Sequence, residues 1–177
     1  MDNQSHIIKV LVVEDNPGDV RLIQEMLKEG DYFRFKLTCV ERLDEAIKQL
    51  DGEVFDVLLL DLGLPDSQKL DTLKNVNYKA PHLPIVVITG LANEMLGIEA
   101  VREGAQDYLT KGQIDSNLLI HSIRYSIERK RMENEIKEKL DTIEKMNKLM
   151  VGRELRMEEL RKENERLRER IRELEKA

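Results

Sequence analysis

Five polar side chains that can do chemistry stand at, or directly after, the ends of short segments rich in apolar residues: Glu14, Asp15, Asp61, Thr89 and Lys111. Three of the five are carboxylates, and clustered carboxylates raise each other's pKa values unless a cation lies among them. Oxygen ligands without cysteine or histidine favour a hard ion, and Mg²⁺ takes few protein ligands and keeps its waters. If the fold brings these residues together, we expect them to form a Mg²⁺ site.

The same residue types also suit phosphoryl transfer. A carboxylate can attack a phosphoryl group and form an aspartyl-phosphate. A metal ion and a lysine can neutralise the charge on the phosphoryl oxygens. Each residue alone has a simpler interpretation, because an acidic residue at a strand end is more often a turn former than a catalyst. Their joint occurrence in this order favours a chemical role.

The segments that precede these residues have the pattern of buried parallel strands. Residues 7–13, 54–60 and 84–89 are almost continuously apolar, which is typical of strands covered on both faces. Two weaker segments, 35–40 and 106–110, predict strands with one face more exposed to water.

Helical patterns separate the strands, at residues 16–30, 42–50, 68–77 and 93–104. The first begins at Asn16, a favourable N-cap, and Gly30 is its stop signal. Alternation of strand and helix predicts an α/β fold with a doubly wound parallel sheet. Ligands of such sheets bind beyond the carboxyl ends of the strands, where the strand order reverses. We therefore expect the five polar side chains to meet at that edge.

The chain changes character near residue 130. Of the 47 residues from 131 to 177, 14 are basic and 13 are acidic, which leaves a net charge of −7 on residues 1–130. This balance is too even for a nucleic-acid-binding arm. After Asp115 there is no proline and one glycine, Gly152, which predicts a long helix. We expect a globular domain over residues 1–130 and a helical coiled-coil extension over 131–177.

The end of this predicted helix carries an apolar seam spaced alternately by four and three residues: Leu160, Asn164, Leu167, Ile171 and Leu174. An asparagine at an a position of a coiled coil costs stability and favours a parallel pair. In that arrangement two cross-helix pairs attract, Glu163 with Arg168 and Arg170 with Glu175, whereas Arg156 and Arg161 repel. The sequence therefore predicts a parallel homodimer. The alternative is a single solvated helix, which leaves its seam exposed to water.

An upstream seam is out of phase with this one: Ile136, Leu140, Ile143, Asn147 and Met150. The phase changes near Gly152. A stutter, a bend or a helix break is therefore expected there.

The single cysteine, Cys39, excludes a disulfide framework and a zinc site built on cysteines, and its apolar surroundings predict a small core residue. The sequence has no leader-like start, and its apolar runs are far shorter than the roughly 20 residues that cross a bilayer. We expect a cytoplasmic protein that does not insert into membranes.

Four segments carry a resemblance to the CheY-like receiver domains of two-component response regulators: VEDNPGD, LLLDLGLPDS, VVITG and DYLTKG. The resemblance covers residues 7 to about 130. It implies a (βα)₅ flavodoxin-like fold with strand order 2-1-3-4-5, here with the last helix extended into the coiled coil. It also implies that Asp61 accepts a phosphoryl group from a sensor histidine kinase in a Mg²⁺-dependent reaction. Such a protein is a signalling phosphoacceptor rather than an enzyme.

The resemblance also assigns the remaining site residues. Glu14 and Asp15 are similar to the acidic pair, with Asp15 and Asp61 holding Mg²⁺ directly beside the backbone carbonyl of Gly63. The residues that contact the phosphoryl group or switch with it are Thr89, Tyr108 and Lys111.

Two positions depart from the family pattern. Gly112 follows the lysine where proline is frequent, which removes an X-Pro cis bond and suggests a glycine-specific dihedral. Lys69 stands where a glycine is common. In addition, Gly63 and Leu91 occupy the positions that set the rate of self-hydrolysis in the family. Because neither can orient a water molecule, we expect a long-lived phosphoryl group.

No segment after residue 130 resembles a known output domain, and three interpretations stay open. The chain can be a phosphorylation-controlled dimer that docks to another protein, or a fragment of a larger signalling protein with an output or kinase module. It can also be a constitutive coiled-coil scaffold.

Overall fold

The computed structural model describes residues 7–28, 33–66, 69–90 and 94–175. Gly30 and Leu91, on which two expectations rest, lie outside the described residues. The chain divides into two compact units, residues 1–133 and 134–177, and each is described by itself.

The first unit contains a five-stranded parallel sheet in the order β2-β1-β3-β4-β5. Its strands are β1 (Ile7–Val13), β2 (Arg34–Val40), β3 (Val57–Asp61), β4 (Ile85–Thr89) and β5 (Asp107–Thr110). The predicted doubly wound α/β fold and its strand order are confirmed. The order reverses between β1 and β3, so the edge beyond these two strands is the switch point of the sheet.

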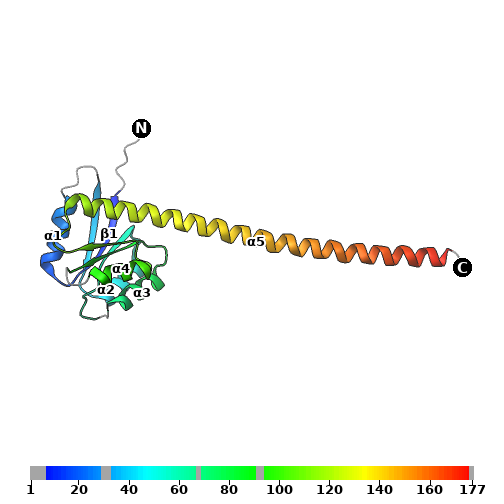
Figure 1. Cartoon of the computed structure of the whole chain (residues 1–177), viewed down its shortest axis with the longest axis horizontal. Coiled ribbons are helices and arrows are strands. Elements are labelled where there is room, and N and C mark those ends of the chain that lie inside the picture. The colour runs from blue at the N-terminus through cyan, green and yellow to red at the C-terminus, as the bar shows by residue number, and fades with distance from the viewer. Residues whose placement is uncertain (1–6, 29–32, 67–68, 91–93, 176–177) are drawn as a thin grey trace, which may run out of the picture. The chain divides into compact units, whose positions relative to one another are not determined.

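Five helices accompany the sheet (Figure 1): α1 (Pro17–Lys28), α2 (Leu43–Gly52), α3 (Leu70–Lys79), α4 (Glu94–Arg102) and α5 (Ser116–Leu174). One core lies between the sheet and helices α1 and α5, through residues such as Ile23 and Leu119. The other core lies beneath α2, α3 and α4, through residues such as Ala46 and Leu73.

Strand β1 contributes to both cores. Val10 and Val12 belong to the α1 and α5 side, and Leu11 and Val13 belong to the opposite side. None of the four side chains is more than 1% exposed. Burial on both faces explains why the strand is continuously apolar in the sequence.

Strand β3 begins three residues later than its apolar pattern predicts, at Val57 instead of Val54. Val54 is 81% exposed, so its apolar side chain does not mark the strand. The carboxylate of Asp56 accepts a hydrogen bond of 2.7 Å from the backbone N–H of Lys9. This bond aligns the start of β3 with β1 through a side chain.

The prediction that Cys39 is a core residue was wrong, because its side chain is exposed. The strand that carries it, β2, lies at the edge of the sheet. The amide of Gln24 lies 3.7 Å from the Cys39 sulfur and donates a weak hydrogen bond to it. An edge strand leaves part of its surface open even where the sequence is apolar.

Helix α5 has 59 residues and is continuous through Gly152, so the chain does not break there. A single glycine costs a helix about 1 kcal/mol. Strong helix formers surround it, and ion pairs within the helix follow, such as Arg156 with Glu159 at 3.0 Å. Among the described residues, no helix is both long and apolar enough to cross a membrane.

Candidate functional site at the carboxyl edge of the sheet

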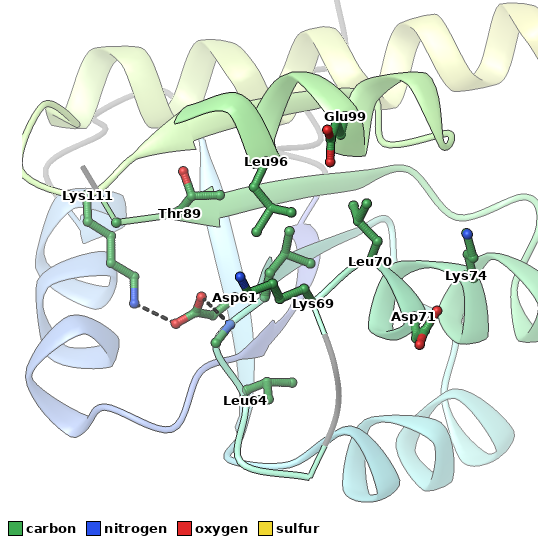
Figure 2. A pocket seen from close by; sticks show the side chains of 13 residues that line it. Asp61, Leu64, Lys69, Leu70, Asp71, Lys74, Thr89, Leu96, Glu99 and Lys111 are labelled. Atoms are coloured by element: carbon green, nitrogen blue, oxygen red, sulfur yellow. Dashed lines mark hydrogen bonds and ion pairs between the residues drawn. The ribbon is translucent and has the colours of Figure 1, made fainter. Parts of the chain in front are cut away.

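The fold brings the predicted polar residues to one edge of the sheet. Glu14 follows β1, Asp61 ends β3 and Thr89 ends β4, while Lys111 follows β5. The backbone N–H of Lys111 donates a 2.7 Å hydrogen bond to the Thr89 carbonyl, which extends the pairing of β4 and β5 by one residue. Figure 2 shows the side chains of Asp61, Thr89 and Lys111 around one pocket.

The Lys111 ammonium is the centre of the cluster. Its Nζ lies 2.7 Å from Asp61 Oδ2, 2.7 Å from Glu14 Oε2 and 2.9 Å from Asp19 Oδ2. Burial by itself lowers the pKa of this ammonium, but hydrogen bonds to Asp61, Glu14 and Asp19 outweigh burial and raise the pKa above its ordinary value. Lys111 is therefore a permanent cation that neutralises part of the acidic cluster.

Asp19 was missed in the sequence. It lies in the first turn of α1, four residues after Asp15, and it brings a further carboxylate to Lys111. An aspartate in a first turn is usually explained by the helix dipole. The signal that could have found it is its position, because the amino end of α1 follows β1 at the same edge as Glu14.

Glu14 is the most buried of the carboxylates, with 2% of its side chain exposed. Burial raises its pKa, and the nearby charge of Asp61 raises it further, while a hydrogen bond from Lys111 acts in the opposite direction. The Glu14 Oε1 atom accepts a hydrogen bond of 3.1 Å from the backbone N–H of Asn16. A buried carboxylate with one ammonium partner can accommodate a second cation.

Glu14, Asp15 and Asp61 each offer a carboxylate oxygen, and these three oxygens lie within 4.8 Å of one another. Asp15 is exposed, whereas Asp61 is 12% exposed. Asp61 Oδ1 accepts a 2.9 Å hydrogen bond from the backbone N–H of Gly63. Three converging oxygens, one of them on an open side chain, fit a small divalent ion that keeps some of its waters.

Thr89 is the last residue of β4, and Tyr108 lies within β5, two residues before the end of that strand. Thr89 is 2% exposed, and its hydroxyl has no hydrogen-bond partner within the part of the chain that the structure describes. Tyr108 is half-buried and packs against the backbone of α4, because a Cβ atom on Gly97 would overlap the Cδ2 atom of the tyrosine ring. The tyrosine ring therefore occupies space that is open only because residue 97 is a glycine without a Cβ atom.

Gly112 has a φ of +84°, so the glycine-specific dihedral expected after Lys111 is confirmed. The second departure from the family pattern, Lys69, has a φ of +39° at the start of α3.

An open pocket of about 1040 Å³ extends from this cluster between α3 and α4. Asp61, Thr89 and Lys111 line it together with residues of the two helices, including Leu70 and Leu96 (Figure 2). A doubly wound sheet with carboxylates and a lysine at its switch point defines the receiver class of signalling domains. The chain belongs to the response regulator receiver domain family, whose family model matches residues 10–124.

Curated relatives match over the same part of the chain. The transcriptional regulatory protein ZraR of Escherichia coli is 28% identical over 104 residues, which are 59% of this chain and 23% of ZraR. The response regulator protein PilR of Pseudomonas aeruginosa is 35% identical over 105 residues, 58% of this chain and 22% of PilR. The match to the transcriptional regulatory protein KdpE of Staphylococcus aureus is 33% identical and covers 43% of KdpE. The chain thus spans less than half the length of each of these relatives.

Solved structures agree on the fold. A sensor protein from Polaromonas sp. JS666 is 28% identical, with a TM-score of 0.61, and the match covers 70% of this chain and 98% of that protein. A response regulator receiver domain protein from Clostridium thermocellum is 24% identical, with a TM-score of 0.62, covering 71% and 98%. The second likeness supports the fold alone.

Acidification should stabilise the metal-free protein before it destabilises it. Because the pKa of Glu14 is raised, the folded state binds a proton there at a pH where the unfolded chain does not. Stability should therefore rise as the pH falls from neutral toward about 4.5, the ordinary value. Glu53 acts in the opposite direction at lower pH, since hydrogen bonds from Lys9 and Lys36 lower its pKa and this stabilisation is lost below about 4.5.

Urea unfolding between pH 7 and pH 5 in the presence of a chelator measures this effect. Glu14→Gln, which has no carboxyl group to titrate, should lack the rise in stability. A rise of equal size in Glu14→Gln would assign the pH dependence to another group.

Proposed function

We propose that this chain is a phosphorylation-controlled receiver in which Asp61 accepts a phosphoryl group from the phosphohistidine of a sensor histidine kinase. One observation carries the proposal: the Asp61 carboxylate lies 2.7 Å from the Lys111 ammonium, which also pairs with the carboxylates of Glu14 and Asp19. An oxygen of Asp61 attacks phosphorus and forms the acyl phosphate, while the phosphorus–nitrogen bond breaks and the electron pair returns to the histidine. Lys111 then pairs with a phosphoryl oxygen.

The three converging carboxylates support Mg²⁺ as the cofactor. Glu14, Asp15 and Asp61 would hold it, with the backbone carbonyl of Gly63 as a further ligand. When bound, the ion supplies positive charge to the phosphoryl oxygens in the transition state. Burial raises the pKa of Glu14, and the neighbouring charge of Asp61 raises it further, so a cation bound between these two carboxylates would offset their repulsion.

The signal would leave the site through Thr89 and Tyr108. The Thr89 hydroxyl is buried with no partner among the described residues, so a phosphoryl oxygen on Asp61 can supply the missing hydrogen bond. A movement of Thr89 toward Asp61 changes the packing beside Tyr108, and the ring can then turn inward from its seat against Gly97. We also propose that residues 1–130 form the receiver domain and that the protein acts in the cytoplasm.

Intact-mass spectrometry after incubation with acetyl phosphate and Mg²⁺ tests this function. The wild type should gain one phosphoryl group, and both a chelator and Asp61→Asn should abolish the gain. Asp71→Asn is a matched control, because Asp71 lines the same pocket from α3. Loss of phosphorylation in Asp71→Asn alone, or its persistence in Asp61→Asn, would contradict the proposal.

We further propose that residues 131–177 form a parallel homodimeric coiled coil. The apolar seam is open to solvent, with exposed fractions between 43% for Leu160 and 66% for Leu174. Arg170 pairs with Glu173 in its own helix at 3.3 Å, and a parallel partner would add Glu175. Both a chain that continues into an output module and a constitutive scaffold are compatible with such a dimer, and the response to phosphorylation distinguishes switching from scaffolding.

A further inference from the structure

Lys69 has a backbone conformation that a lysine rarely adopts. Its φ of +39° and ψ of −109° lie close to the first central position of a type II′ turn, which glycine dominates. It is the one non-glycine residue with a positive φ in the described part of the chain. Strained backbone of this kind costs free energy and concentrates at functional sites. A lysine at this position therefore indicates a role for its side chain.

The Lys69 side chain extends into the pocket that contains Asp61. Both residues line this pocket, and Figure 2 shows Lys69 reaching from the start of α3 toward the side of Asp61 that does not face Lys111. Leu70 and Leu96 line the same pocket and give it an apolar part. The ammonium is therefore placed at the pocket's acidic end by the strained turn.

The Lys69 ammonium has no polar partner among the residues that the structure describes. No ion pair or hydrogen bond joins the Lys69 side chain to any of the residues that the structure describes. The other lysines of the pocket differ: Lys111 has three carboxylate partners, and Lys74 pairs with Glu103 at 3.6 Å. An ammonium directed into a pocket without a partner can bind an anion there.

The charge of the site shows which anion would need it. The site holds four carboxylates: Glu14, Asp19 and Asp61 pair with Lys111, and Asp15 offers an oxygen within 4.8 Å of those of Glu14 and Asp61. In the aspartyl phosphate, a phosphoryl charge of about −1.5 to −2 replaces the single charge of the Asp61 carboxylate, while the other three carboxylates remain. One Mg²⁺ and the Lys111 ammonium do not balance the resulting negative charge. A second ammonium on the open side of Asp61 reduces the excess.

We propose that Lys69 is a second phosphoryl-binding cation, which pairs with an oxygen of the phosphoryl group on Asp61 that Lys111 does not contact. The proposal rests on the proposed function of Asp61 and adds a residue at a position where the family commonly has glycine. The strain at Lys69 is then the cost of placing an ammonium directly before α3, within reach of the phosphoryl group.

Calorimetric titration with beryllofluoride, a phosphoryl mimic, in the presence of Mg²⁺ tests the assignment. Lys69→Gln keeps a side chain in the strained turn and removes the charge. It should weaken binding by about two- to fivefold, since an exposed ion pair is worth up to roughly 1 kcal/mol. Lys69→Arg should bind close to wild type. Lys74→Gln, which removes another lysine of the same pocket, should also leave binding unchanged. The difference between Lys69→Gln and wild type should shrink at high salt.

Lys69→Gly separates the strain from the charge. It should lose as much beryllofluoride affinity as Lys69→Gln, yet its melting temperature without ligand should be at least that of wild type, because glycine adopts this conformation freely. Wild-type affinity of Lys69→Gln for beryllofluoride would overturn the role of Lys69. A loss of affinity in Lys74→Gln equal to that in Lys69→Gln would also overturn it. In both cases, binding by wild type that depends on Asp61 would preserve the proposed function. Absence of binding by wild type would contradict both.

Discussion

Replacement of Lys111 by methionine should lower the free energy of unfolding of the metal-free protein by about 3 kcal/mol at pH 7, because breaking a buried ion pair costs about 3–5 kcal/mol and this site is partly open. The variant leaves two neighbouring carboxylates, the buried Glu14 and the largely buried Asp61, without their shared ammonium. The methionine stem keeps most of the packing of the lysine stem. The loss therefore reports charge rather than a cavity.

Magnesium should reverse much of this loss. A divalent ion bound by Glu14, Asp15 and Asp61 replaces the missing positive charge, and binding to the folded state alone stabilises it. Urea unfolding with and without millimolar Mg²⁺ measures the difference. The apparent affinity for Mg²⁺ should be higher in Lys111→Met than in wild type, since the ammonium no longer competes for the carboxylates.

Lys74→Met is the control for this experiment. Lys74 pairs with Glu103 at 3.6 Å, and both side chains are about half exposed, so its loss should cost less than about 1 kcal/mol. Its stability should not depend on Mg²⁺ more than that of wild type. A Lys111→Met variant whose stability Mg²⁺ leaves unchanged would contradict the cation site.

The positions of Glu14, Asp61, Thr89 and Lys111 were predictable because the period of a strand and the direction of a parallel sheet fix where carboxyl ends meet. Four apolar segments of one orientation must place their last residues at one edge. Side-chain geometry is not needed to predict these four positions. Asp19 is different, because it reaches the same ammonium from the first turn of a helix and no apolar pattern marks its direction.

The errors have related causes. Cys39 lies in an apolar segment, but hydrophobicity along a strand does not reveal whether the strand is central or at the edge of its sheet, where one side lacks a neighbour. The strained backbone of Lys69 was equally out of reach, because only the turn before α3 defines it. The sequence shows that lysine replaces a common glycine there, and the structure shows the backbone cost of that replacement.

The phase change in the C-terminal helix is a matter of spacing rather than of helix propensity. The step from Met150, the last residue of the upstream seam, to Leu160, the first of the downstream seam, is ten residues, three more than a heptad. An insertion of three overwinds a coiled coil locally. A continuous helix accommodates this step without a break at Gly152. In the proposed dimer, the downstream seam would fix the register, because Asn164 would become buried between the two helices.

Ile171→Lys should raise the dissociation constant of the proposed dimer by at least a hundredfold. In a symmetric parallel pair, the substitution places two ammonium groups opposite each other at one level of the seam. Sedimentation velocity of the full chain measures the dissociation constant. Leu155→Lys is the matched control: Leu155 is 63% exposed, comparable with 54% for Ile171, but it lies off the downstream seam. A monomeric wild type, or equal dissociation of both variants, would refute the coiled-coil dimer.

Beryllofluoride then separates a switch from a scaffold in the same experiment. A wild-type dimer that forms only with Mg²⁺ and beryllofluoride, and does not form in Asp61→Asn, would couple Asp61 to assembly through α5. A dimer of equal stability under every condition would assign association to the seam alone. The phosphoryl signal would in that case rearrange the receiver surface around Tyr108 within a permanent dimer. If the free energy of coupling between phosphorylation and output does not change association, it must change a conformational equilibrium.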